Sequence, residues 1–220
     1  MPTAAEPQLF HFRDWTFRFQ AAKKEPSRLL IVLHGWMGDE NSMWVLLRKL
    51  SSHYAILAPR GLHPVPEGGY SWREIKPNTW GNASLEDLRT SAEELLSFLD
   101  EWSISAGVNA SQFDAMGFSQ GAAMTLTLAL LHPERVLRMA VLSGFIPENS
   151  EFLLNPGKLS GKSVFLSHGR KDDLIPIERA RKALDLLRNA GAQVTYCESD
   201  AGHRLSKECL GAMEMYLGES

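Results

Sequence analysis

The segment with the clearest chemical potential lies at residues 117–121, which read G-F-S-Q-G. This G-x-S-x-G pattern follows an expected strand, 113–116, and opens an apolar helix expected at 120–131, which is the strand–turn–helix setting of such a motif. Such a turn exposes the hydroxyl of Ser119 at the positive end of the helix. It needs glycines because a Cβ at either end would strike neighbouring backbone. We therefore expect Ser119 to be a nucleophile; the alternative is a structural turn flanked by glycines.

A serine hydroxyl needs a base to activate it, and the base needs an acid to orient it. For a strand–turn–helix nucleophile, the order along the chain is serine, acid, histidine. Three histidines follow Ser119, but only His203 also follows a plausible acid that comes after a strand. We interpret His132, at the end of the helix after Ser119, and His168, which precedes the acid, as structural. His203 is therefore the expected base.

The acid should follow the strand expected at 163–166, where Asp172 and Asp173 stand side by side. Neighbouring side chains in an extended loop point apart, so only one of them can face His203. We choose Asp172 and leave Asp173 to solvent or to a turn cap. Glu148, which follows an earlier strand, is a third candidate.

Attack by a serine on a carbonyl places negative charge on its oxygen, and each preorganised N–H donor there can be worth about 3–4 kcal/mol. One donor should be the backbone amide of Gln120, the residue after the nucleophile. The other should come from residues 34–38 (H-G-W-M-G), which follow the apolar run 29–33. We assign it to the amide of Trp36, with Met37 as the competitor.

Aromatic side chains near an exposed serine could bind an acyl group. Trp36 lies in the expected oxyanion loop, and Tyr70, Trp72 and Trp80 lie in a connection at 62–81 that is rich in glycine and proline. The same rings could instead pin this connection to the body of the protein. We assign substrate binding to Trp36 and Trp72.

The elements that must position these residues alternate between strands and helices, which predicts right-handed crossovers and an α/β fold. We expect a mostly parallel central sheet with helices on both faces, in a single domain over residues 1–220. The short step from 144 to 162 leaves no room for a large lid. The expected strands are 29–33, 54–58, 113–118, 138–142, 163–166 and 193–197, with a short antiparallel strand or a hairpin at 9–19. The expected helices are 41–52, 84–106, 120–131, 177–189 and 205–217.

The composition excludes several classes of protein. The 220 residues have a net charge of −3 and 44% hydrophobic residues, so neither a disordered chain nor a general nucleic-acid binder is expected. The longest apolar run, 122–131, is half of the roughly 20 residues that span a bilayer, and the first residues lack a secretory pattern. We expect no stable membrane insertion.

The two cysteines, Cys197 and Cys209, are too few for a four-thiolate zinc site. We expect no disulfide framework and infer a reducing compartment, the cytoplasm.

Five stretches together resemble the α/β-hydrolase fold, and more closely its phospholipase/carboxylesterase family, which includes acyl-protein thioesterases. The resemblance implies that Ser119, Asp172 and His203 form a catalytic triad acting on small esters or thioesters, and that a homodimer can form. The chain departs from the family at Trp36 and Met37, where the loop is one residue longer, and at Asp173, where the family often has proline. The matching stretches are 33–35 (L-H-G), 69–72 (G-Y-S-W), 117–121, 168–176 (H-G-R-K-D-D-L-I-P) and 202–203 (G-H).

The expected reaction passes through an acyl-enzyme and requires no metal or organic cofactor. Without a lid, an open site favours small or short acyl groups. Two alternatives stay open. One is a peptidase or another acyl transferase, because the same triad serves amides. The other is a ligand-binding or receptor-like protein of the same fold with slow turnover, because fold does not dictate function.

Overall fold

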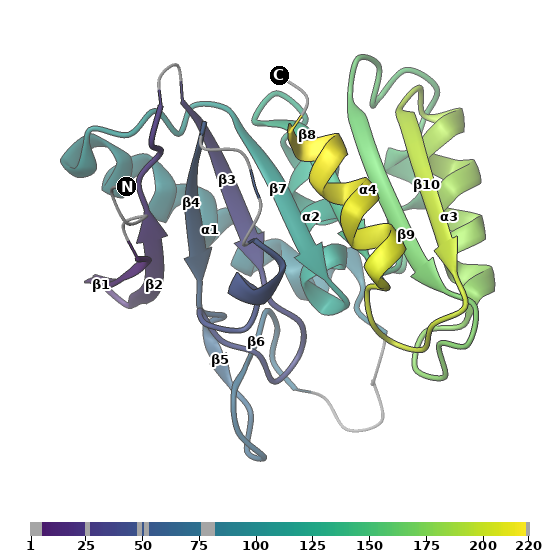
Figure 1. Cartoon of the computed structure of the whole chain (residues 1–220), viewed down its shortest axis with the longest axis horizontal. Coiled ribbons are helices and arrows are strands. Elements are labelled where there is room, and N and C mark those ends of the chain that lie inside the picture. Colours follow the sequence, from purple (N-terminus) through teal and green to yellow (C-terminus); the bar gives the residue numbers. More distant parts are fainter. Residues whose placement is uncertain (1–5, 25–26, 48–49, 51–52, 76–81, 219–220) are drawn as a thin grey trace.

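The computed structural model describes residues 6–24, 27–47, 50, 53–75 and 82–218. Its centre is a twisted eight-stranded sheet in the order β1-β2-β4-β3-β7-β8-β9-β10 (Figure 1). The first two strands form an antiparallel hairpin, β2 pairs antiparallel with β4, and all other neighbours are parallel. The strands are β1 (Gln8–Phe12), β2 (Trp15–Gln20), β3 (Arg28–Leu33), β4 (Tyr54–Pro59), β7 (Phe113–Phe118), β8 (Val136–Leu142), β9 (Ser163–Gly169) and β10 (Gln193–Ser199). The expected mostly parallel sheet is confirmed, and of the two alternatives for the N-terminal segment the structure forms the hairpin.

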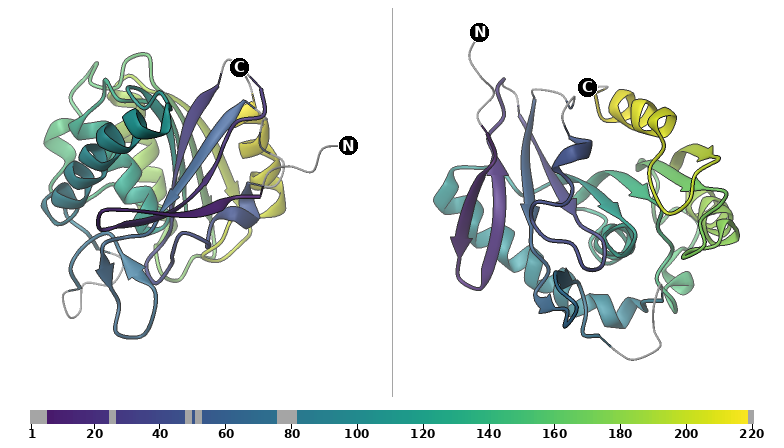
Figure 2. Two further views of the ribbon diagram at one scale, coloured as in Figure 1. Left: turned by 90° about the vertical axis from the view of Figure 1, so that its left-hand side faces the viewer. Right: turned by 60° about the horizontal axis from the view of Figure 1, so that its bottom comes forward.

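Helices cover both faces of the sheet. One face carries α1 (Leu85–Ala106), α2 (Gln120–Leu131) and α3 (Ile177–Asn189), and the other carries α4 (Lys207–Gly218). Seen along the sheet in the left panel of Figure 2, α4 lies on the opposite side from α1 and α2. No helix in the described part of the chain combines the length and apolar character needed to cross a membrane.

The continuous apolar runs form strands because both of their faces are buried. In β3, Ile31 and Leu33 pack into the core under α1, α2 and α3, while Leu30 and Val32 pack into the core under α4. Strand side chains alternate between faces, so one short run serves both cores. This explains why β3 shows no polar alternation and still sits in the middle of the sheet.

The long helix α1 begins where its sequence signals predicted. Ser84 is the N-cap, its side chain accepts a bond from the Asp87 N–H, and the Asp87 carboxylate accepts one from the Ser84 N–H. This reciprocal capping box satisfies two donors that the first helical turn leaves open. The helix ends at Gly107, whose φ of 65° is a left-handed conformation that glycine adopts without strain.

The helix expected at 41–52 is wrong for the described residues, which form only a 3₁₀ turn, Trp44–Leu46. The Leu47 N–H bonds the Trp44 carbonyl three residues back, at 3.1 Å. A spacing of three suits a 3₁₀ turn as well as an α-helix, so Trp44, Leu47 and Leu50 could not distinguish them. The long connection after β4 contains a small hairpin, β5 (His63–Pro64) with β6 (Tyr70–Ser71).

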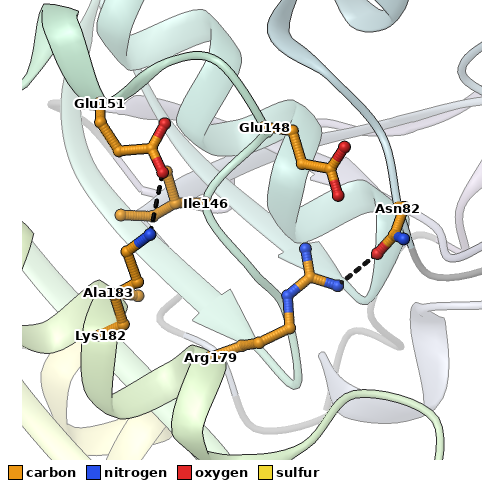
Figure 3. A pocket seen from close by; sticks show the side chains of 7 residues that line it. All are labelled: Asn82, Ile146, Glu148, Glu151, Arg179, Lys182 and Ala183. Atoms are coloured by element: carbon orange, nitrogen blue, oxygen red, sulfur yellow. Dashed lines mark hydrogen bonds and ion pairs between the residues drawn. The ribbon is translucent and has the colours of Figure 1, made fainter.

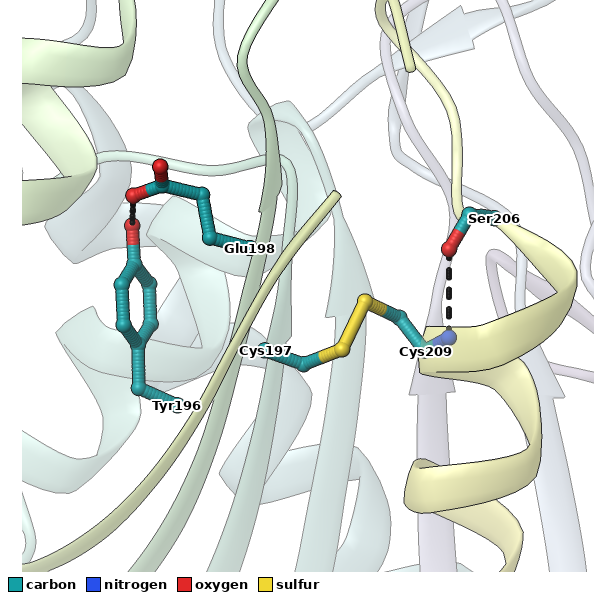
Figure 4. The surroundings of a disulfide bond; sticks show 5 residues. All are labelled: Tyr196, Cys197, Glu198, Ser206 and Cys209. Atoms are coloured by element: carbon teal, nitrogen blue, oxygen red, sulfur yellow. Dashed lines mark hydrogen bonds between the residues drawn. A yellow bond between two sulfur atoms is a disulfide. The ribbon is translucent and has the colours of Figure 1, made fainter. Parts of the chain in front are cut away.

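The two cysteines are joined by a disulfide, Cys197–Cys209, which corrects the expectation of a chain without one (Figure 4). Cys197 lies in β10 and Cys209 in the first turn of α4. After β10 the chain turns back, so that α4 packs on the sheet. This places the Cα atoms of the two cysteines 5.7 Å apart, a distance that a disulfide can span. The composition could not show this return of the chain.

Candidate active site

The serine turn joins β7 to α2 at the carboxyl edge of the sheet. Ser119 has φ 55° and ψ −116°, a strained conformation for a residue other than glycine. A Cβ on Gly117 would lie 2.0 Å from the Gly121 carbonyl oxygen, and one on Gly121 would lie 2.2 Å from the Leu33 oxygen. Gly117 is therefore needed for β7 to approach the start of α2, and Gly121 for α2 to approach the end of β3, as the motif predicted.

Three side chains from distant parts of the chain meet beside this turn. His203 Nε2 lies 3.0 Å from Ser119 Oγ, and His203 Nδ1 lies 2.7 Å from Asp172 Oδ2. A carboxylate only accepts hydrogen bonds, so Nδ1 carries the proton and the Nε2 lone pair faces the serine. The order and geometry are those of a nucleophile, a base and an orienting acid.

Of the two adjacent aspartates, the structure turns Asp172 toward His203. Asp172 is 6% exposed, and its Oδ1 accepts the N–H groups of Leu174 and Ile175 at 3.0 and 2.9 Å. Asp173 is exposed. The two backbone bonds orient the Asp172 carboxylate, so that its second oxygen stays available to His203.

Glu148, the third candidate acid, belongs to a different place. It lies opposite Arg179 on a groove of about 300 Å³ (Figure 3). In that groove Arg179 donates to the Asn82 side-chain oxygen at 2.8 Å, and Lys182 pairs with Glu151 at 3.0 Å. The acid that reaches His203 is Asp172 alone among the three candidates.

The other two histidines after Ser119 do not reach its hydroxyl. His132 caps the C-terminus of α2 and lies 3.1 Å from Glu93. His168 is buried beneath Asp172, where its Nε2 lies 2.8 Å from the Ile175 carbonyl and 3.3 Å from Asp172 Oδ2. Burial lowers the pKa of His168, which favours its neutral form. No group of three or more His, Cys, Asp or Glu side chains among the described residues is arranged to hold a metal ion.

The loop after β3 makes a tight turn in which the Gly38 N–H bonds the Gly35 carbonyl at 3.0 Å. Met37 has a φ of 63° within this turn, and Trp36 is half-buried. A Cβ placed on Gly35 would lie 3.5 Å from Ser119 Cβ, so this loop runs directly beside the nucleophile. The position suits a donor to an oxyanion formed at Ser119.

The pocket assignment of Trp72 does not fit its position. Its side chain is 0% exposed, and its indole N–H donates to the His34 carbonyl at 2.8 Å. A fully buried ring offers no surface to a substrate. Tyr70 packs under the Arg60 guanidinium, 4.6 Å from the ring centroid. Trp80 lies outside the described residues.

The sequence reasoning missed the part played by His34, the residue before the oxyanion loop. His34 is buried; its Nε2 accepts the Gly61 N–H at 2.9 Å, and its Nδ1 donates to the Gly35 carbonyl at 2.7 Å. Burial lowers the pKa of His34 from 6.5 to about 4. Only the neutral ring fits these partners, because the Gly61 N–H needs an acceptor. A histidine that closes an apolar strand is the signal that could have suggested this role.

Comparisons with known proteins agree with this fold. The chain matches the family described as Phospholipase/Carboxylesterase over residues 16–219. The Arabidopsis thaliana protein named "Probable carboxylesterase SOBER1-like" is 34% identical over 154 residues, 67% of this chain and 58% of that protein. "Acyl-protein thioesterase 1" of Kluyveromyces lactis is 31% identical over 176 residues, 72% of this chain and 75% of that protein. The crystal structure of the Bacillus cereus carboxylesterase superimposes with a TM-score of 0.80 at 26% identity, covering 91% of this chain and 92% of that one.

The match to the plant relative covers less than two thirds of that protein's length. The family match, in contrast, runs from β2 to the end of α4, so it includes the serine turn, the acid loop and the histidine loop. The chain therefore belongs to the phospholipase/carboxylesterase family and has the α/β-hydrolase fold.

Proposed function

We propose that the protein is a serine hydrolase that cleaves carboxylic esters of small or short-acyl compounds, with thioesters as a second substrate class. The observation that carries the proposal is the continuous hydrogen-bonded series from Asp172 through His203 to Ser119, with distances of 2.7 and 3.0 Å. Family membership supports the same reaction class.

In the first half-reaction, His203 Nε2 takes the Ser119 proton as the hydroxyl oxygen attacks the acyl carbon. The carboxylate of Asp172 stabilises the imidazolium that forms. The N–H groups of Gln120 and Trp36 are the proposed donors to the oxyanion. The imidazolium then protonates the leaving alcohol or thiol, which leaves an acyl group on Ser119. Water repeats the cycle and releases the acid.

The acyl group is proposed to rest against Trp36, which is half-buried in the oxyanion loop. Trp72 is withdrawn from this role because it is fully buried. No large insertion follows β8; the described chain there contains only the 3₁₀ turn Glu151–Leu153. An open site of this kind favours short or flexible acyl groups.

The test combines covalent labelling with turnover. A fluorophosphonate probe should label the wild-type protein rapidly, and Ser119→Ala should abolish both labelling and hydrolysis of p-nitrophenyl butyrate. Ser91→Ala is the matched control, because it removes a buried hydroxyl from α1, which is not part of the serine turn.

The substrate class is decided by a panel of p-nitrophenyl esters of increasing length, acyl thioesters and peptide amides. We expect turnover to be highest on short esters. Preference for long acyl chains over butyrate would overturn the short-acyl assignment. Labelling at Ser119 without turnover of any member would identify a binding protein of the same fold instead.

A further inference from the structure

We propose that the side chain of Gln120, as distinct from its backbone amide, is a positioning group for the oxyanion hole. Its carboxamide ties the serine turn to residues 60–73, and these in turn hold the loop that carries Trp36. The kinetic consequence rests on the proposed esterase function, whereas the mechanical connection is visible in the contacts themselves.

The first link runs from Gln120 to the end of the segment 60–73, at Ser71 and Trp72. Gln120 Oε1 accepts the backbone N–H of Trp72 at 2.9 Å, and its Nε2 donates to Ser71 Oγ at 3.0 Å. A backbone N–H can only donate, so the carboxamide oxygen must face Trp72. All three residues are buried. Water is therefore not at hand to replace these bonds if the carboxamide is removed.

The second link runs from Trp72 to the end of β3. The Trp72 indole N–H donates to the His34 carbonyl at 2.8 Å, and the two rings pack with centroids 4.9 Å apart. The same segment supplies the Gly61 N–H to His34 Nε2 at 2.9 Å. His34 is therefore held at its carbonyl and at its ring by one stretch of chain.

The third link sets the direction of the donor. His34 Nδ1 and the Gly38 N–H both donate to the Gly35 carbonyl, at 2.7 and 3.0 Å. That carbonyl shares a planar peptide with the Trp36 N–H, so fixing one fixes the other. The Ser119 carbonyl likewise accepts the N–H groups of Ala122 and Ala123, and it shares its peptide with the Gln120 N–H.

Each proposed oxyanion donor, the N–H of Trp36 or of Gln120, is thus in the same peptide group as a carbonyl that is held by hydrogen bonds. The Gln120 carboxamide connects these two peptide groups through Trp72 and His34. A further contact, the Tyr70 N–H to the Gly38 carbonyl at 2.9 Å, holds only the exit of the loop. Loss of the carboxamide would leave the Trp72 N–H buried without an acceptor, and the segment would shift to recover one.

The test is Gln120→Met, which keeps the length of the side chain and removes its hydrogen bonds. Loss of a whole oxyanion donor costs about 10²–10³ in kcat, so a displaced donor should cost about 10- to 100-fold. The KM and the pH profile of kcat should stay close to wild type, because His203 and Asp172 are untouched. Thr127→Val is the control; it removes a buried hydrogen bond within α2, to the Ala123 carbonyl, that does not reach residues 60–73.

A second variant removes the hydrogen bond from Trp72 to the His34 carbonyl. Trp72→Phe replaces the indole with a smaller aromatic ring, so it deletes the indole N–H and keeps the backbone N–H that Gln120 holds. If both act through one series of contacts, the double variant should lose little more kcat than the more damaged single variant. Additive losses in the double variant would overturn the proposed route.

Hydrogen exchange gives a readout that does not depend on activity. The Gly38 amide should exchange faster in Gln120→Met and Trp72→Phe, but not in Thr127→Val. A folded Gln120→Met protein with wild-type kcat and wild-type exchange would overturn the inference. If the wild type hydrolyses no ester, the proposed function fails, and exchange at Gly38 still decides whether the carboxamide holds the loop.

Discussion

The two sides of the candidate site are held in place by different means. On the side of the nucleophile, backbone packs on backbone and buried hydrogen bonds connect the Gln120 carboxamide, Trp72 and His34. On the side of the base, the loop that carries His203 is bounded by a disulfide between β10 and α4.

The histidine loop packs closely against the end of β9, where a Cβ on Gly169 would lie 2.2 Å from the Ala201 carbonyl oxygen, but it is more open at Gly202. The Lys171 N–H bonds the Ala201 carbonyl at 2.9 Å, and the ion pair of Lys171 with Asp200 is largely exposed. A Cβ placed on Gly202 would meet only the Lys171 oxygen, at an ordinary 3.5 Å. The corresponding distance at Gly121 is 2.2 Å.

The two sides are held differently because they have different proposed roles in the reaction. Oxyanion donors act only when they are preorganised, so their peptides must not reorient during the reaction. The imidazole has to exchange protons with serine, leaving group and water, and it is aimed by a single strong bond to Asp172. The disulfide between β10 and α4 limits where the loop that carries the ring can go.

The largest expected effect comes from the bond that aims the base. In Asp172→Asn, the amide oxygen can still accept the Leu174 and Ile175 N–H groups, while the amide NH₂ faces His203 Nδ1. That arrangement favours the wrong tautomer, and kcat should fall by about 10⁴-fold. Asp173→Asn is the control, and it should retain wild-type kcat because Asp173 is exposed. Equal losses in the two variants would contradict the assignment of Asp172.

The second largest expected effect is on stability, and it comes from the packing of backbone on backbone at Gly121. Gly121→Ala should lower the free energy of unfolding by about 3–4 kcal/mol or prevent folding, because the clash is with the backbone of β3. Gly202→Ala should change it by less than about 0.5 kcal/mol. Urea denaturation of both variants compares the two sides directly. Similar losses at Gly121 and Gly202 would remove the contrast.

Acid should weaken the nucleophile side through His34. The unfolded imidazole binds a proton as pH falls through 6.5, whereas the folded ring stays neutral down to about pH 4. His34 therefore makes its full contribution to the free energy of unfolding above pH 6.5. About 3 kcal/mol of that free energy is lost between pH 6.5 and pH 4. Urea denaturation between pH 7 and pH 4 measures the loss. Nitrogen-15 spectra should show a neutral Nδ1–H tautomer of His34 at pH 6, and an imidazolium signal there would contradict this explanation.

The disulfide should have the smallest effect on catalysis. Its cysteines are 12 residues apart in sequence, and a cross-link of this size is worth about 2–3 kcal/mol of stability. The double variant Cys197→Ala/Cys209→Ala should lose about that much in urea denaturation. Its kcat at 25 °C should fall only a few-fold, because β10 pairs with β9 and α4 packs through Met213 and Leu217. A dithiol should lower the stability of the wild type and leave the double variant unchanged. No change in the wild type would mean that the disulfide contributes nothing.

Much of the fold could be predicted because its signals are local. The apolar run of α2 gave its bounds, Gln120–Leu131, and Ser84 marked the start of α1. A pattern that fits two structures could not decide between them. The spacing of apolar residues around the 3₁₀ turn Trp44–Leu46 suits an α-helix equally well. The candidate site followed a similar pattern. Gly117 and Gly121 predicted the strained turn at Ser119. The composition did not indicate that Cys197 and Cys209 would form a disulfide.

By itself, the sequence determined most of the strands and helices, and it supplied a serine turn followed by an acid and a histidine in the right order. These features depend on spacings of a few residues. Only the tertiary structure decided that Asp172 faces His203, that Trp72 is buried beneath the loop, and that the Gln120 carboxamide reaches across to it. These outcomes depend on how loops from separate strands fill one volume at the sheet edge, and no local spacing encodes which side chains share that volume.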